Sequence, residues 1–398
     1  MKTVHHSNLF SGFPVVIKIL YKQSSLIIVD NDYFAPQKVK NQRECPSIQI
    51  QFARFTVITF YTVDGERTMS KYSALRTRIN NGEVILLDGA IGTQLQNMRA
   101  PMNNQAWAAA VLETHPFTVR RMHENYIDAG VDVITTNTYS VGRQNLEPLG
   151  LVEKLEELNL RAVMLAQDAR DVCAKERPVY IAGSVSNFGL LAGGEPGWKD
   201  YMRTRVLMNR RSETSDTQAQ ANLVEQAEML AEAGVDLLVA EATGSAKHRH
   251  WVIEACVSTG LPVWAGFKCN LDANGDLRVG YRSDDLFETS LDNLLALGAE
   301  VATIFHSTIE ATSAALPVMQ KHWDGPIGVY PDADRSDYLR TYRDDTTDNA
   351  ISPEAYVEIT KNWVEQGVQI IGGCCGFEIE YIRPLREALP KKIGNRST

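Results

Sequence analysis

Short apolar runs alternate with longer amphipathic stretches along most of the chain, from about residue 70 onward. The short runs are nearly continuous and rich in Val and Ile, which is typical of parallel strands covered on both faces. Eight candidate strands result: Val84–Ala90, Val131–Tyr139, Val179–Ser186, Val235–Ala242, Pro262–Asn270, Val301–Ser307, Pro326–Asp332 and Val368–Cys375.

Helical patterns lie between these strands, for example Thr118–Ala129, Val152–Ala174, Gln218–Ala233, Asp285–Leu297 and Pro353–Gln366. Three end at a glycine that leads directly into a strand, Gly130, Gly234 and Gly367, as expected of helix C-caps. Eight such units in about 320 residues predict an α/β fold, a single (β/α)8 TIM barrel. The alternative is a doubly wound sheet, but no G-x-G-x-x-G turn follows the first strand.

The first 68 residues lack this order. Two apolar runs, Phe13 to Tyr21 and Ser24 to Val29, show no sustained helical or strand period, and acids such as Asp30 fit a transit peptide badly. We therefore expect residues 1–68 to be an N-terminal extension and residues 69–398 to be the barrel domain. The extension is either an appendage ahead of a functional start at Met69 or a poorly ordered segment.

Two segments are longer than an ordinary connection, Leu190 to Asp216 and Asp332 to Ser352. Loops that follow barrel strands cover the catalytic mouth, so both are candidate lids or substrate contacts, with mobile surface loops as the alternative.

Charge and cysteine content limit the partners. With 40 Lys and Arg against 49 Asp and Glu, the net charge of -9 argues against a nucleic-acid surface. No apolar run approaches the roughly 20 residues of a membrane span. Six cysteines, two of them adjacent, and no signal peptide predict reduced thiols in the cytoplasm. We expect small-molecule partners; the sequence carries no signature of an oligomeric state.

Polar and metal-binding residues end the predicted strands, where barrels place functional side chains. They are Asp88, Asn137 with Thr138, Ser184, Glu241, Cys269 with Asn270, His306, Tyr330 with Asp332, and Cys374 with Cys375. Because glycines flank them, Cys374 and Cys375 are able to reach one metal ion together, and zinc accepts sulfur ligands. Buried structural cysteines or a vicinal disulfide are the alternatives, since the usual C-x-x-C spacing is absent.

The ordered motifs resemble those of the homocysteine S-methyltransferase family, which includes betaine–homocysteine and S-methylmethionine–homocysteine enzymes. The resemblance runs from about Ser70 to about Leu389. It rests on the Asp88-Gly89-Ala90-Ile91-Gly92-Thr93 turn, Trp107, the run Tyr126 to Tyr139, Ala182-Gly183-Ser184, Asp236 with Glu241, and Gly372-Gly373-Cys374-Cys375. It implies a Zn²⁺ cofactor.

One position departs from the family pattern. The family's zinc site has three thiolates, the first from an Asn-Cys at the end of strand 6, where this chain has His306. Imidazole also binds zinc, and catalytic Cys₂His sites exist, so the resemblance implies that His306, Cys374 and Cys375 are the catalytic metal ligands. His306 as an ordinary core residue, or Cys269 as a weaker substitute, are the alternatives. Losing one thiolate makes the site less anionic and the bound thiolate a poorer nucleophile.

The resemblance also implies substrate contacts. Asp88 and Glu241 match residues that bind the homocysteine amino group, and Asn137, Thr138 and Ser184 are expected to line the pocket. A helix-capping role for Asp88, an ion pair for Glu241 and loop hydrogen bonds for the other three are the structural alternatives.

The expected activity is zinc-dependent transfer of a methyl group from an onium donor to the thiol of homocysteine, giving methionine. The donor is S-methylmethionine, S-adenosylmethionine or a betaine, bound directly, because no cobalamin or folate module follows the barrel. Two rival hypotheses remain: a zinc hydrolase that activates water, and a non-catalytic relative that binds zinc or a thiol.

Overall fold

The computed structural model describes residues 17–22, 25–30, 71–102, 108–190, 214–280, 285–333 and 351–393. The chain divides into two units, Met1–Glu66 and Arg67–Thr398. In the first unit, strands β1 (Ile17–Lys22) and β2 (Ser25–Asp30) pair antiparallel. These strands fall within the two apolar runs of the extension, whose β-branched residues favour strands.

Eight parallel strands form the sheet of the second unit, in the order β3-β12-β11-β10-β7-β6-β5-β4. A parallel bridge between Leu87 and Val133 joins the two end strands, so the sheet closes into a barrel. The strands are β3 (Ile85–Leu86), β4 (Val133–Thr135), β5 (Tyr180–Ser186), β6 (Leu237–Ala242), β7 (Val263–Phe267), β10 (Val301–Phe305), β11 (Ile327–Tyr330) and β12 (Ile370–Ile371).

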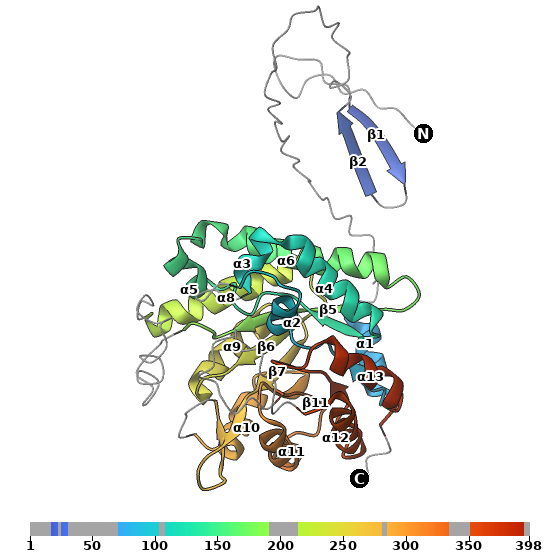
Figure 1. Ribbon diagram of the computed structural model, residues 1–398. Coiled ribbons are helices and arrows are strands. Elements are labelled where there is room, and N and C mark those ends of the chain that lie inside the picture. Colours follow the sequence, from blue (N-terminus) through green and yellow to red (C-terminus); the bar gives the residue numbers. More distant parts are fainter. Residues whose placement is uncertain are drawn as a thin grey trace, which may run out of the picture. The chain divides into compact units, whose positions relative to one another are not determined.

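Helices surround this barrel (Figure 1). They are α1 (Lys71–Asn80), α2 (Gly92–Asn97), α3 (Ala109–Thr114), α4 (Pro116–Asp128), α5 (Arg143–Leu146), α6 (Leu155–Cys173), α8 (Asp216–Glu232), α9 (Ala246–Ser258), α10 (Phe287–Leu295), α11 (Ile309–His322), α12 (Pro353–Glu365) and α13 (Ile379–Ala388). Gly130 and Gly234 follow α4 and α8 with φ of 97° and 86°, the left-handed conformation of a helix C-cap. No helix in the described part of the chain is long and apolar enough to cross a membrane.

Alternate strand residues face opposite sides of the barrel wall. Ile85, Val239 and Trp264 belong to the cluster inside the barrel, whereas their neighbours Leu86, Leu238 and Val263 pack with the helices outside. Both faces are therefore apolar, which explains the nearly continuous apolar runs of the sequence.

Helix α1 belongs to the interior cluster and covers the barrel end where the strands begin. Tyr72, Leu75 and Ile79 are at most 4% exposed, and the Trp264 indole donates a hydrogen bond to the Tyr72 hydroxyl at 3.1 Å. The opposite end, where the strands terminate, is thus left as the accessible mouth.

The eight predicted strands all form, and the TIM-barrel prediction is confirmed. Most of them are shorter than predicted, with β3, β4 and β12 reduced to two or three residues. The run predicted to reach Asn270 stops at Phe267, and β8 (Cys269–Leu271) instead pairs antiparallel with β9 (Leu277–Val279). Residues 191–213 and 334–350, which contain most of the two candidate lids, lie outside the described residues, as does Trp107.

The domain boundary gives the first testable prediction. We propose that a chain starting at Met69 folds as the full chain does, because it keeps α1. A chain starting at Asn81 loses three buried side chains, each worth about 1.5–3 kcal/mol, and should unfold about 10 °C lower or more. Thermal unfolding followed by circular dichroism measures both. If the Met69 start alone lost the cooperative transition, contacts upstream would be essential.

Candidate metal and substrate site

The predicted site residues gather at the mouth of the barrel, where their strands end. His306 directly follows β10, Asp332 comes two residues after β11, and Cys374 three residues after β12. Because these three strands are neighbours in the sheet, side chains just past their ends meet.

Two glycines shape the turn that carries the cysteines. A Cβ atom at Gly372 would lie 2.9 Å from the Asp88 carbonyl oxygen, and one at Gly373 would lie 2.4 Å from Cβ of Phe377. The backbone is fixed by hydrogen bonds from Cys374 N to the Pro331 oxygen at 2.8 Å and from Phe377 N to the Cys374 oxygen at 2.9 Å. Only glycine allows this close approach, so the pair of thiols is held against both neighbouring strands.

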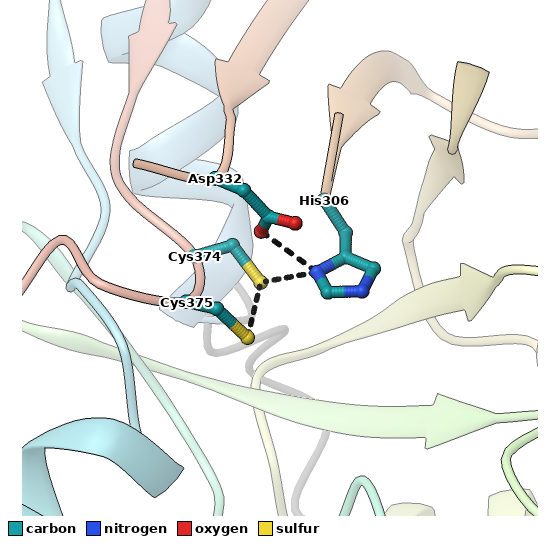
Figure 2. A group of neighbouring side chains, drawn as sticks. All are labelled: His306, Asp332, Cys374 and Cys375. Carbon is teal, nitrogen blue, oxygen red and sulfur yellow. Dashed lines mark hydrogen bonds and ion pairs between the residues drawn. The ribbon is translucent and has the colours of Figure 1, made fainter. Parts of the chain in front are cut away.

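Four side chains converge on one point (Figure 2): His306, Asp332, Cys374 and Cys375. One ligand atom from each lies within 4.8 Å of all the others. Nδ1 of His306 lies 2.7 Å from Oδ1 of Asp332 and 3.4 Å from Sγ of Cys374, and the two sulfur atoms are 4.0 Å apart. The three residues predicted as metal ligands are thus together, with an acid that the prediction did not include.

The distances that involve sulfur fit a zinc ion, whereas the 2.7 Å between Nδ1 of His306 and Oδ1 of Asp332 is that of a hydrogen bond. Adjacent ligands of a tetrahedral ion bonded at about 2.0–2.3 Å are separated by about 3.3–3.8 Å. The nitrogen–sulfur and sulfur–sulfur separations, 3.4 and 4.0 Å, are close to this range. Sulfur and imidazole donors also suit zinc better than magnesium or calcium.

The backbone of His306 is held in an uncommon conformation. Its φ is 46°, a left-handed value that costs energy for a residue with a side chain. Its N–H donates to the Tyr330 oxygen at 3.1 Å, and Nζ of Lys268 donates to its carbonyl oxygen at 2.7 Å. The structure thereby directs the imidazole toward the thiols rather than along the strand.

Neighbouring charges shift the pKa values of His306, Cys374 and Cys375. Burial lowers the pKa of His306, but the negative charges of Asp332 and Cys375 outweigh it and bring the pKa to about 9. Between the two thiols, a hydrogen bond donated by Cys374 lowers the pKa of Cys375 and raises that of Cys374. One sulfur of the pair therefore ionises readily, as metal binding requires.

Asp88 lies at the end of β3 and does not cap a helix, since α2 has no side-chain cap. It accepts hydrogen bonds from Thr135, from the backbone N–H at 2.6 Å and from the hydroxyl at 2.9 Å. Burial raises the pKa of the Asp88 carboxyl to about 8, against these two bonds, and the charge of Glu241 adds to the rise. Asp88 is thus a buried acid whose ionisation a nearby cation would favour.

Glu241, near the end of β6, is 8% exposed and accepts a hydrogen bond from the Ser184 hydroxyl. Burial raises its pKa to about 7, against the Ser184 bond and the positive charge of His306. The ion pairs found among the described residues, such as His306 with Asp332, do not include Glu241. The neighbouring Tyr330 lowers the pKa of Glu241, and Glu241 raises the pKa of the buried Tyr330 hydroxyl.

Asn137 and Thr138 are engaged with the backbone. The Asn137 amide donates to the Ala108 oxygen at 3.0 Å, and the Thr138 hydroxyl donates to the Ser184 oxygen at 2.7 Å. Cys269 is fully buried, with its sulfur 3.5 Å from the Ser307 hydroxyl, and it is not part of the four-residue group. Of these three predicted pocket residues, Ser184 is the one whose side chain contacts Glu241.

Sequence reasoning missed two residues. Asp332 was recognised only as a strand end, yet β10 and β11 pair in register at Phe305 and Tyr330, which places the residues just beyond them side by side. Lys268 follows the apolar strand β7 and is 2% exposed. A single basic residue ending a buried strand was the signal that could have identified it.

Comparison with known proteins identifies the family. The model of the homocysteine S-methyltransferase family matches residues 85–389. A selenocysteine methyltransferase of Astragalus bisulcatus is 26% identical over 336 residues, which cover 77% of this chain and 93% of that protein. Homocysteine S-methyltransferase 2 of Zea mays is 25% identical, over 78% of this chain and 91% of its own.

A solved structure supports the fold. The metallated form of the homocysteine methyltransferase MmuM of Escherichia coli superposes with a TM-score of 0.58 at 22% identity, covering 79% of this chain and 99% of that one. Since the family model also spans most of the chain, including every strand of the barrel, the protein belongs to the homocysteine S-methyltransferase family and is a methyltransferase.

Proposed function

We propose that the protein transfers a methyl group from an onium donor to the thiol of homocysteine, with a zinc ion held by His306, Cys374 and Cys375. The observation that carries the proposal is the convergence of these side chains within 4.8 Å at the barrel mouth. Bound zinc would keep the acceptor thiol deprotonated near neutral pH, where a free thiol with a pKa of about 8.5 is mostly protonated.

Asp88 and Glu241 would orient the amino acid that accepts the methyl group. Asp88 and Glu241 are buried carboxyls near the metal group, and the ammonium group of an amino acid is the cation that would ionise both. Holding the ammonium directs the sulfur along the line of attack, an entropic contribution to catalysis. Ser184 supports this arrangement through its hydrogen bond to Glu241.

The reaction forms a bond between the acceptor sulfur and the methyl carbon. The bond from that carbon to the donor's onium atom breaks, the electron pair stays on the donor, and the thiol proton passes to solvent. S-methylmethionine, S-adenosylmethionine and betaines all meet this description. Methyl transfer from each donor to homocysteine, selenocysteine and cysteine, with metal analysis of the same sample, tests the function. Absence of transfer with every pair, in zinc-loaded protein, would favour a non-catalytic relative.

The ligand set gives a prediction on metal content. Cys374→Ser, Cys375→Ser and His306→Ala should each lose zinc to a mild chelator and lose activity while the barrel stays folded, because one of three protein ligands is removed. His306→Cys should retain zinc, since it offers a thiolate in place of the imidazole. Zinc bound after dialysis is the measurement.

Cys173→Ser is the matched control, because Cys173 ends α6 and lies outside the four-residue group. It should retain zinc as the parent does. Full zinc retention by His306→Ala would show that another group completes the site.

The raised pKa of Asp88 gives a prediction on pH. Only the carboxylate pairs with an ammonium group, and burial keeps Asp88 half-protonated at about pH 8. Affinity for methionine, a thiol-free probe, should therefore rise from pH 6 to pH 8. Asp88→Asn, which is neutral at every pH, should weaken binding about 10- to 100-fold.

Isothermal titration calorimetry across this pH range provides the measurement. The des-amino analogue 4-(methylthio)butanoate is the control, and its affinity should not rise with pH because it has no ammonium group. The same pH slope in Asp88→Asn as in the parent would assign the ammonium site to other residues.

A further inference from the structure

One nitrogen of His306 has two neighbours that compete for it. Nδ1 contacts both Oδ1 of Asp332, at 2.7 Å, and Sγ of Cys374, at 3.4 Å. Figure 2 shows Nδ1 turned toward these two groups and Nε2 turned away from both sulfur atoms. A metal ion bound with the two thiolates therefore meets His306 at Nδ1.

Metal binding at Nδ1 would remove the hydrogen-bond partner of Asp332. A nitrogen that gives its lone pair to a metal has no proton left to donate on the same atom, so the bond from Nδ1 to Asp332 ends when the metal enters. The carboxylate then lies beside a dication, and its side chain is only 5% exposed. A bond from a carboxylate oxygen to the metal would give this buried anion a partner in place of the lost hydrogen bond.

We propose that Asp332 is the fourth protein ligand of the resting metal site, an inference that rests on the zinc site of the proposed function. The metal is bound by two sulfur atoms, one nitrogen and one oxygen, from three neighbouring strand ends. Asp332 does not act as the outer hydrogen-bond partner of a zinc-bound histidine, because such a partner occupies the ring nitrogen that the metal leaves free.

The charge of the site changes accordingly. Two thiolates and a neutral imidazole exactly neutralise a dication, and the Asp332 carboxylate adds one negative charge. Lys268 lies close to this group, since its Nζ donates to the His306 oxygen at 2.7 Å, and its cation balances the added charge. The buried lysine thereby belongs to the same electrostatic unit as the four ligands.

Substitution by cysteine tests whether position 332 reaches the metal. With Co²⁺ alone as the probe, thiolate-to-cobalt charge-transfer absorption increases with the number of thiolate ligands. The parent protein should show the absorption of two thiolates, and Asp332→Cys should show about 1.5-fold more, because a third joins them. Asp332→Asn, nearly identical in shape, should shift the visible cobalt bands and weaken cobalt binding at least about 10-fold.

Asp292→Cys is the matched control. Asp292 forms a similar pair on the surface, with its Oδ1 2.6 Å from Nδ1 of His322, but no metal-binding group of the described residues includes it. This variant should keep the parent spectrum. A two-thiolate spectrum that neither Asp332 variant alters would overturn the fourth ligand and leave the zinc site standing. A parent protein without any thiolate band would refute both.

Discussion

The whole site depends on how closely β12 approaches β3. Gly372 and Gly373 lie where any Cβ atom would meet Asp88, Leu87 or Phe377. Because the chain there has no side chains, the last strand passes directly against the first and turns at once into Cys374 and Cys375. The contact between these two strands also brings the thiols close to Asp88. The absence of a side chain at Gly372 and Gly373 therefore matters both for the packing of β12 and for the placement of the two thiols.

The mouth of the barrel buries several groups whose charges are incompletely balanced. Burial raises the pKa values of Asp88 and Glu241 well above those of exposed carboxyls. A folded protein keeps such acids at a cost in stability, which is typical of sites prepared for a charged ligand. The missing charge is positive in both halves of the site, a metal cation beside the thiols and an ammonium group beside the acids. A zwitterionic amino acid with a thiol would supply the ammonium group for the acids, and its sulfur would be a further ligand for a metal cation held by the thiols.

The sequence was sufficient to predict the barrel because both faces of every strand are apolar and glycines mark the helix ends. It also predicted His306, Cys374 and Cys375 as neighbours, since all three follow strands. It was insufficient where a role depends on register or on a local turn. Asp332 was only one polar residue among several until the pairing of β10 with β11 placed it beside His306. The break after Phe267, ahead of the β8–β9 hairpin, was marked in the sequence only by the single charged residue Lys268.

The pairing of β10 with β11 also bears on the presence of His306 where the family has a thiolate. From the sequence, a histidine in that position makes the site less anionic and the acceptor sulfur less nucleophilic. The structure places a carboxylate 2.7 Å from the imidazole, so the charge that the histidine lacks is present on the next strand. In the resting site that we propose, two thiolates, an imidazole and a carboxylate would have the net charge of three thiolates around the same ion. Because a carboxylate oxygen is a harder donor than sulfur and zinc accepts thiolates well, the acceptor sulfur would replace it readily. Asp332 would thus balance the charge of the site until the acceptor binds.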